Sequence, residues 1–264
     1  MRLFGCDYDG TLRIGTVAKG DLEALARFRK AGNRFAIVSG RGKGMIWKEL
    51  QYFGVEVDFL IADNGAIIFD ENGDEIWRLD PDQSVVRQII DFGLTLKNTL
   101  VGFGDGHGFA GLGVKEEKIE KPNFNALLDS VEADPQELLA QGKINAILLR
   151  GVHPEDSFKL QQMVQERWGK QVTTCLNNGT LDIIAAGASK QAALEWLKEY
   201  LHASEVLTLG DGYNDIGMIS AFGGYAMENA PQEVKAKAAG TVASVAEYLL
   251  KWEKNNEEKT DCGL

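Results

Sequence analysis

The sequence has little positive charge and no long apolar run. Lysine and arginine together number 28 against 39 aspartate and glutamate residues, which gives a formal net charge of −11. A surface this acidic repels nucleic-acid backbones and anionic lipids, and no local basic patch offsets it, so we expect neither as a partner. No apolar segment approaches the roughly 18 residues of a membrane span, and the apolar start Leu3–Cys6 is too short for a signal peptide.

Cysteine and histidine are also scarce. The three cysteines form neither a disulfide framework nor a Cys-x-x-Cys metal pair, so we expect free thiols and a cytoplasmic location; they are Cys6, Cys175 and Cys262. The three histidines are scattered along the chain, which argues against a histidine-rich metal site or a His-containing catalytic triad.

The composition is that of an ordinary globular protein, and the 264 residues suffice for one large or two modest domains. Short apolar runs alternate with helical patterns at the start of the chain: strands at 3–6, 35–38 and 59–62, and helices around 22–29, with Thr16 as a possible cap, and at 43–53. This alternation predicts βαβ units and a parallel sheet. Asn72-Gly73 between two apolar segments predicts a hairpin.

From about Pro81 to Ala185 the order changes to helices interleaved with hairpins, with a polar loop between Val114 and Ile144. This order predicts an α+β layer with an antiparallel sheet. After Ala185 the first pattern resumes. The sequence therefore predicts an α/β protein whose parallel-sheet core, residues 1–80 and 186–264, is interrupted by an inserted α+β domain, residues 81–185.

Polar clusters follow the predicted core strands, where ligands bind in open parallel sheets. In chain order the clusters are Asp7 to Leu12, Ser39-Gly40-Arg41, Asp63-Asn64-Gly65 and Gly210 to Asp215. Carboxylates that converge on one edge of a sheet require a cation, and their hard oxygen ligands suit Mg²⁺. The sequence therefore predicts a magnesium site at this edge.

Each of these patterns, taken alone, could have a purely structural role. A single Asp-Gly is usually a turn or a helix cap, but Asp-x-Asp-Gly-Thr at one strand end matched by Gly-Asp-x-x-Asn-Asp at another is specific. The glycines of 106–111 fit a dinucleotide-binding pattern, yet no helix opens there. Hairpin turns and a loop that faces the active site both remain as interpretations of that segment.

With these motifs the sequence resembles the haloacid dehalogenase (HAD) superfamily phosphatases, in particular the Cof-type group with a type IIB cap. Asp7 to Leu12 is similar to the first motif of the superfamily and Ser39-Gly40-Arg41 to the second, while Ser189-Lys190 and Gly210 to Asp215 are similar to the third and fourth. The resemblance spans the whole chain. The segment Gly240 to Val245 departs from it, because it lacks the Asp-Gly-Val element usual in the Cof-type group.

The resemblance implies a role for each motif residue. Asp7 would be the nucleophile that forms an aspartyl-phosphate, and Asp9 the general acid and base. Mg²⁺ would be held by Asp7, the backbone carbonyl of Asp9, and Asp211. The phosphoryl oxygens would be bound by Ser39, Gly40, Lys190 and Asn214, and Asp215 would orient Lys190. Phosphoryl transfer independently needs such charge neutralisation, since a carboxylate nucleophile repels a phosphate dianion.

The expected activity is hydrolysis of a small phosphorylated metabolite, with a sugar phosphate as the expected substrate. Two alternatives remain open from the sequence: a phosphomutase of the phosphomannomutase type, and a noncatalytic phosphometabolite-binding protein. Retention of all the motif residues argues against the second. The substrate-selecting positions are expected in the loop Gly102 to Gly113 and at Arg150 and Asn177. The sequence does not indicate the oligomeric state.

Overall fold

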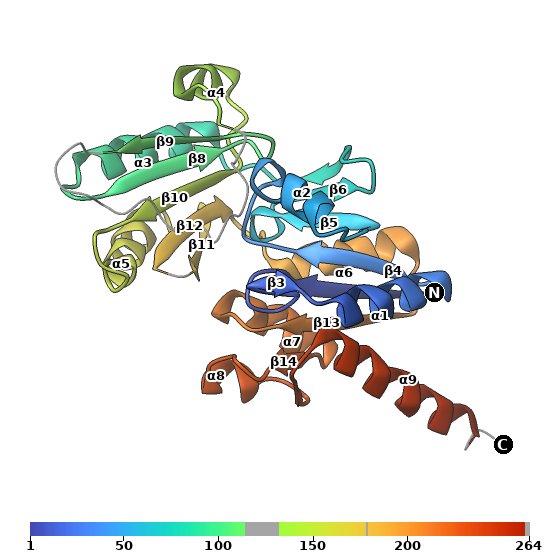
Figure 1. Cartoon of the computed structure of the whole chain (residues 1–264). Helices are drawn as coiled ribbons and strands as arrows, with labels where there is room; N and C mark the ends of the chain where they lie inside the picture. The colour runs from blue at the N-terminus through green and yellow to red at the C-terminus, as the bar shows by residue number, and fades with distance from the viewer. Residues whose placement is uncertain (114–131, 178, 262–264) are drawn as a thin grey trace.

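The computed structural model describes residues 1–113, 132–177 and 179–261, and its two larger β-sheets are set apart from each other (Figure 1). The larger sheet has the strand order β15-β14-β13-β1-β4-β5-β6-β7. Its strands are β1 (Arg2–Asp7), β4 (Arg34–Val38), β5 (Phe59–Ala62), β6 (Ile67–Asp70), β7 (Glu75–Arg78), β13 (Glu205–Gly210), β14 (Tyr225–Met227) and β15 (Thr241–Val242). The pairs from β15 to β5 are parallel, and β6 and β7 add an antiparallel hairpin at one edge.

Helices cover both faces of the larger sheet, so its central strands are apolar on both sides. Leu3 and Phe4 are neighbours on β1 and point to opposite faces, yet both are fully buried. Phe4 packs with α1, α2 and α9, and Leu3 packs with α6 and α7. The helices of this part are α1 (Lys19–Lys30), α2 (Lys43–Tyr52), α6 (Lys190–Leu201), α7 (Ile216–Phe222), α8 (Gln232–Lys235), α9 (Val245–Asp261) and the short η1 (Asp63–Gly65) and η2 (Tyr213–Asp215).

The smaller sheet is antiparallel, with the strand order β11-β12-β10-β8-β9. Its strands are β8 (Leu100–Gly104), β9 (Phe109–Gly113), β10 (Ala146–Arg150), β11 (Val172–Asn177) and β12 (Thr180–Ala185), and its helices are α3 (Gln83–Thr95), α4 (Pro135–Gln141) and α5 (Asp156–Trp168). Ile89, Ile147 and Val164 join α3, β10 and α5 in a separate apolar cluster. These elements lie together at the upper left of Figure 1, away from both chain ends.

The chain leaves the larger sheet after β7 and returns to it through α6, so the smaller sheet is an insertion in sequence. The predicted fold class, an α/β protein with a parallel-sheet core and an inserted α+β layer, is thereby confirmed. The Asn72-Gly73 hairpin is also present, as β6 and β7, with Gly73 at a φ of 81°.

Two local predictions are wrong. Thr16 does not cap a helix, because it lies in β3 (Thr16–Val17), which pairs with β2 (Arg13–Ile14) around Gly15 at a φ of 74°. The segment before Ile144 is not wholly a polar loop, because it contains α4. The Asp134 carboxylate caps that helix by accepting hydrogen bonds from two backbone N–H groups, and Pro135 opens its first turn.

Of the described cysteines, Cys6 and Cys175 are free thiols, in line with the expectation for them. Cys262 lies outside the described residues. Among the helices that the structure describes, none has both the length and the apolar character needed to cross a bilayer.

Candidate active site

The carboxyl ends of the parallel strands collect the acidic motifs at one edge of the larger sheet. Asp7 is the last residue of β1, and Asp211 directly follows β13, which pairs with β1 in parallel. Carboxylate oxygens of Asp7, Asp211 and Asp215 lie within 4.8 Å of one another. The predicted convergence of carboxylates is therefore real for these three side chains.

Lys190 neutralises part of this charge from the first position of α6. Ser189 caps the helix by accepting a hydrogen bond from the N–H of Ala192 at 3.0 Å, as expected from sequence. The Lys190 Nζ atom donates to Asp7 Oδ1 and to Asp215 Oδ1, both at 2.6 Å, and the lysine is only 2% exposed. Burial alone would lower the pKa of Lys190, but Asp215 and Asp7 outweigh it and the pKa is raised.

Burial raises the pKa of two acidic groups in this cluster, because it disfavours their charged form. Burial raises the pKa of Asp7 well above its ordinary value, against the opposing effect of Lys190. Burial also raises the pKa of Asp211, whose Oδ1 accepts a hydrogen bond from the Thr11 hydroxyl at 2.7 Å. One lysine among three carboxylates leaves an excess of negative charge that a bound cation would offset.

The donor set of this cluster fits a hard divalent cation. The second oxygen of Asp215 accepts hydrogen bonds from the N–H groups of Asp211 and Gly212 at 3.0 and 2.8 Å, so Asp7 and Asp211 are the carboxylates better placed to coordinate. Only oxygen ligands are on offer, which matches the preference of Mg²⁺. Gly10 has a φ of 87°, and a Cβ there would collide with the Asp211 carboxylate, so this position must be glycine.

Asp9 lies apart from this cluster and is held by two arginines. Its Oδ1 accepts a hydrogen bond from Arg13 at 2.9 Å, and its Oδ2 accepts one from Arg41 Nε at 2.8 Å; a further Arg41 nitrogen contacts Oδ1. Glu49, only 1% exposed, lies behind both arginines at 2.9 and 3.2 Å and also accepts a hydrogen bond from Tyr8. Sequence reasoning missed Arg13 and Glu49, because nothing in their local patterns marks them.

The other predicted phosphate ligands, Ser39, Gly40 and Asn214, lie next to Asn64. The Ser39 hydroxyl is buried and accepts a hydrogen bond from the Arg41 N–H at 3.1 Å. Asn214 donates to the side-chain oxygen of Asn64 at 2.9 Å. A Cβ at Gly40 would lie 2.9 Å from the Asn177 amide nitrogen and 3.2 Å from that of Asn64, so the missing side chain makes room for both of these side chains. The backbone N–H of Asn64 donates to the Ser39 carbonyl at 2.9 Å, so all three residues adjoin Asn64, which the sequence placed in the polar cluster after 59–62 without assigning it a role.

A cavity of about 120 Å³ lies between the two sheets. One wall includes Asp9, Arg41 and Asp63, which belong to the part that carries the larger sheet. The opposite wall belongs to the inserted part. It includes Arg150, Asn177 and four residues of the loop that was expected to select the substrate: Gly104, Gly106, Gly108 and Phe109. The glycine-rich segment 106–111 is therefore both a hairpin turn and a wall of the cavity, with no helix opening there.

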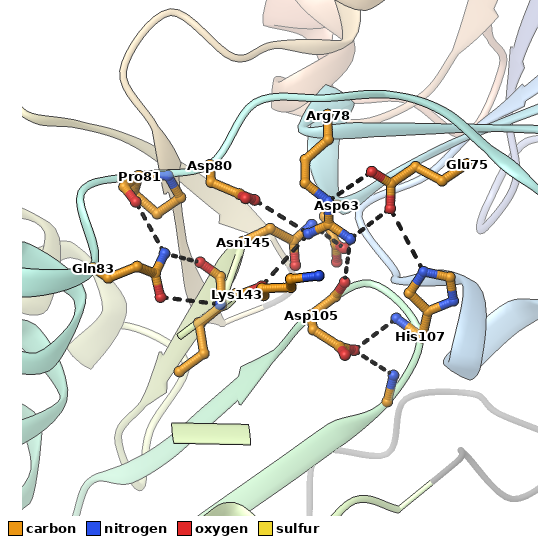
Figure 2. A network of polar contacts seen from close by, with 12 residues as sticks. Asp63, Glu75, Arg78, Asp80, Pro81, Gln83, Asp105, His107, Lys143 and Asn145 are labelled. Atoms are coloured by element: carbon orange, nitrogen blue, oxygen red, sulfur yellow. Dashed lines mark hydrogen bonds and ion pairs between the residues drawn. The ribbon is translucent and has the colours of Figure 1, made fainter. Parts of the chain in front are cut away.

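Asp63 also follows a core strand, but it is not part of the cluster of Asp7, Asp211 and Asp215. Asp63 and Asn64 both have positive φ, 48° and 54°, which turns the chain sharply after β5. The Asp63 carboxylate accepts a hydrogen bond from Asn145 of the inserted part at 2.9 Å (Figure 2). Asp182, in the middle of β12, likewise accepts one from Asn64 at 2.9 Å. The signal for Asp182 was its charge inside an apolar strand.

Arg78 ties the two parts together beside this contact. Figure 2 shows its guanidinium between Glu75 and Asp80, with distances of 2.8 and 3.1 Å. It also donates to the backbone carbonyl of Asp105 at 2.9 Å. The Asp105 carboxylate in turn accepts hydrogen bonds from two N–H groups of the β8–β9 turn. One arginine therefore anchors the glycine-rich turn that lines the cavity.

Known proteins are similar to this chain in sequence and in fold. A family model described as haloacid dehalogenase-like hydrolase matches residues 4–248. The chain is 26% identical over 242 residues to an HMP-PP phosphatase of Klebsiella pneumoniae, covering 89% of this chain and 87% of that protein. It is 25% identical over 283 residues to the pyridoxal phosphate phosphatase YbhA of Escherichia coli, covering 94% and 97%.

Solved structures share the fold at lower identity. The HAD subclass IIB sugar phosphatase BT4131 is similar with a TM-score of 0.80 and 22% identity, covering 97% of this chain and 99% of that one. TM0651 from Thermotoga maritima is similar with a TM-score of 0.76 and 24% identity, covering 95% and 96%. The likeness extends over both the larger and the smaller sheet.

Proposed function

The chain belongs to the haloacid dehalogenase-like hydrolase family, and from this premise we propose that it is a Mg²⁺-dependent phosphatase of small phosphomonoesters, with sugar phosphates as substrates. Phosphoric monoester hydrolysis as the activity class follows from the family and from the phosphatases among its relatives. The observation that carries the proposal is the buried Lys190 bridging Asp7 and Asp215 beside Asp211.

Asp7 is the proposed nucleophile. One of its carboxylate oxygens attacks phosphorus, and the bond from phosphorus to the leaving-group oxygen breaks, which yields an aspartyl-phosphate. Water then attacks the same phosphorus, and inorganic phosphate leaves with the Asp7 carboxylate restored. Lys190 supports both steps because its ammonium lies 2.6 Å from Asp7 and offsets the repulsion between carboxylate and phosphate.

Asp9 is the proposed general acid and base. It gives a proton to the leaving-group oxygen in the first step and takes one from water in the second. In this structure both Asp9 oxygens accept hydrogen bonds from arginines. The proposed role therefore requires Asp9 to exchange at least one of its contacts with Arg13 or Arg41 for the leaving-group oxygen.

The remaining predicted residues have supporting roles in the proposal. Asp7, Asp211 and the backbone carbonyl of Asp9 would hold Mg²⁺, which when bound supplies positive charge beside the phosphoryl oxygens. Ser39, Gly40 and Asn214 would bind phosphoryl oxygens once Asn214 releases Asn64. Asp215 orients Lys190, and two backbone N–H groups fix the Asp215 carboxylate in turn.

The domain division is part of the same proposal. Residues 81–185 form a cap that selects the leaving group, and residues 1–80 and 186–264 form the catalytic core. The cavity between the two sheets supports this division, because both parts contribute to its walls. We also propose a cytoplasmic location, since the described cysteines Cys6 and Cys175 are free thiols.

Phosphate release from a panel of phosphorylated metabolites tests the proposal. With Mg²⁺ the full chain should release inorganic phosphate from at least one sugar phosphate, and the Asp7→Asn variant should release none. Product analysis separates the alternatives, because a phosphomutase would return an isomerised sugar phosphate. Absence of turnover with every compound, together with measurable binding, would indicate a noncatalytic binding protein instead.

A further inference from the structure

Glu49 is a buried acid on the inner face of α2, and the proposed chemistry gives it no role. It is 1% exposed, and its buried neighbours on that helix are Ile46 and Leu50. A buried ion pair is weak evidence for stability, because apolar side chains of similar volume in its place are often as stable or more stable. The position of Glu49 therefore requires a reason other than packing.

Two arginines connect Glu49 to Asp9. Arg13 Nε lies 2.9 Å from Glu49 Oε1, and Arg13 Nη2 donates to Asp9 Oδ1 at 2.9 Å. Arg41 Nη1 donates to Glu49 Oε2 at 3.2 Å, and Arg41 Nε donates to Asp9 Oδ2 at 2.8 Å. Each guanidinium group therefore bridges the two carboxylates, and each oxygen of Glu49 contacts one arginine.

Further contacts hold these bridges in place. Tyr8 donates its hydroxyl to Glu49 Oε1 at 3.1 Å, and the guanidinium carbons of both arginines lie 5.7 Å from the centre of the Tyr8 ring. The Arg13 N–H donates to the Tyr8 carbonyl at 2.8 Å, and the Gly10 N–H donates to the Arg13 carbonyl at 3.0 Å. These backbone hydrogen bonds tie Arg13 to the same turn that carries Asp9.

The two carboxylates differ in their access to the cavity. The Asp9 side chain is 24% exposed and lines the cavity, whereas Glu49 is not among the described residues that line it. Two guanidinium groups and two carboxylates balance in charge. Without the Glu49 charge, two largely buried guanidinium groups would share the one carboxylate of Asp9, and they would no longer be fixed from behind.

The contacts also distinguish the two oxygens of Asp9. Its Oδ1 atom is contacted by both Arg13 and Arg41, whereas Oδ2 accepts a hydrogen bond from Arg41 alone among the described residues. Asp9 can therefore give up the contact at Oδ2 to the leaving-group oxygen and stay held at Oδ1 by both arginines.

We propose that Glu49 and Arg13 are positioning residues that hold Asp9 Oδ1, so that Oδ2 faces the leaving-group oxygen. The assignment rests on the proposed role of Asp9 as general acid and deepens it. The proton on Oδ2 moves to the leaving-group oxygen as the bond from phosphorus to that oxygen breaks, and Asp9 is left as a carboxylate. A displacement of about 1 Å in such a group can cost about 10² in rate.

Two aryl phosphates test the assignment with the full chain and Mg²⁺. Phenyl phosphate and p-nitrophenyl phosphate differ only in the nitro group, which stabilises the departing phenolate, so phenyl phosphate depends more on a general acid. The quantity measured is kcat/KM, because it covers the steps up to loss of the leaving group and not the later hydrolysis of the phosphoenzyme. The ratio of the two kcat/KM values does not depend on the fraction of active protein.

Glu49→Gln keeps the size of the side chain without its charge, and Arg13→Lys keeps the charge without the fork that bridges two carboxylates. Each variant should lower kcat/KM for phenyl phosphate by about tenfold or more, and for p-nitrophenyl phosphate by no more than about threefold. Glu23→Gln, at an exposed position of α1, is the matched control and should leave the ratio unchanged.

An Asp9→Asn background shows whether the effect passes through Asp9. With no acid left to position, the addition of Glu49→Gln to Asp9→Asn should change kcat/KM for phenyl phosphate by less than about twofold. A role of Glu49 in the fold of the site alone would instead lower kcat/KM by the same factor in both backgrounds.

The outcomes separate this assignment from the proposed function. An unchanged ratio in both single variants overturns the assignment, and so does a further tenfold loss in the Asp9→Asn background. Arg13→Lys decides if Glu49→Gln does not fold, and loss of folding in both overturns the assignment, because the bridges would then serve the fold. An Asp9→Asn variant that loses equally with the two aryl phosphates overturns the acid role of Asp9 itself. Absence of phosphate release from both aryl phosphates and from every metabolite of the panel in the wild type overturns the proposed function.

Discussion

Replacing Lys190 by methionine removes the only cation that contacts both Asp7 and Asp215 in the described structure. Lys190, Asp7 and Asp215 are 2%, 6% and 1% exposed, and both ion-pair distances are 2.6 Å. Methionine is of similar length, so it fills the same space without the charge. Breaking a buried pair of this kind costs about 3–5 kcal/mol, because the carboxylates stay buried without a partner.

This loss of stability corresponds to a large decrease in the Tm. For a chain of this size each kcal/mol changes Tm by roughly 2–4 °C, so Lys190→Met should lower the Tm by about 10 °C in the presence of a chelator. The variant site is also one charge more negative, so Mg²⁺ should raise the Tm of the variant by more than that of the wild type. Differential scanning calorimetry with chelator and with Mg²⁺ measures both effects.

Lys48→Met, at an exposed position of α2, is the matched control and should leave the Tm nearly unchanged. A Lys190→Met variant that unfolds within about 2 °C of the wild type in chelator would refute the reasoning, because the buried carboxylates would then not depend on Lys190.

Three further predictions concern catalysis and stability. Asp9→Asn should lower kcat for a sugar phosphate by about 10²–10⁴, and less for the first step with p-nitrophenyl phosphate, whose leaving group needs little protonation; stopped-flow comparison of the two substrates checks this. Chelation should abolish phosphate release and added Mg²⁺ should restore it, whereas full activity in metal-stripped protein would contradict the metal site. Because burial raises the pKa of Asp182 to about 7, the folded chain binds more protons than the unfolded chain between about pH 4 and 7, so stability falls as the pH rises through this window. Urea unfolding at pH 5 and pH 7 measures the free energy of unfolding of the wild type and of Asp182→Asn. From pH 5 to pH 7 the variant should become more stable relative to the wild type by about 2–3 kcal/mol, and a difference that stays constant between the two pH values would refute the raised pKa.

The sequence was informative wherever a local pattern decides the structure. Buried strands such as β1 and β4 are short apolar runs, and Ser189 before Lys190 carries the chemistry of a helix cap. Because the strands are parallel, their carboxyl ends meet at one edge, and this sufficed to predict that Asp7 and Asp211 lie close together.

Contacts between distant segments could not be predicted in this way. The hydrogen bond from Asn64 to Asp182 joins residues 118 positions apart, and the one from Asn145 to Asp63 spans 82. Their partners depend on how the inserted part sits against the larger sheet, which no local periodicity encodes. The pairing of Asp9 with Arg41 has the same origin, since two loops at the edge of the sheet bring them together.

Detection of a phosphorylated chain tests the central claim most directly. Asp9→Asn protein mixed with Mg²⁺ and p-nitrophenyl phosphate, whose leaving group needs little protonation, then quenched rapidly in acid and digested, should carry one phosphoryl group on the peptide that contains Asp7. The covalent species should accumulate because water activation is slowed in this variant. The Asp7→Asn variant should carry none. A phosphoryl group on another residue, or phosphorylation at full rate in the Asp7→Asn variant, would contradict the account.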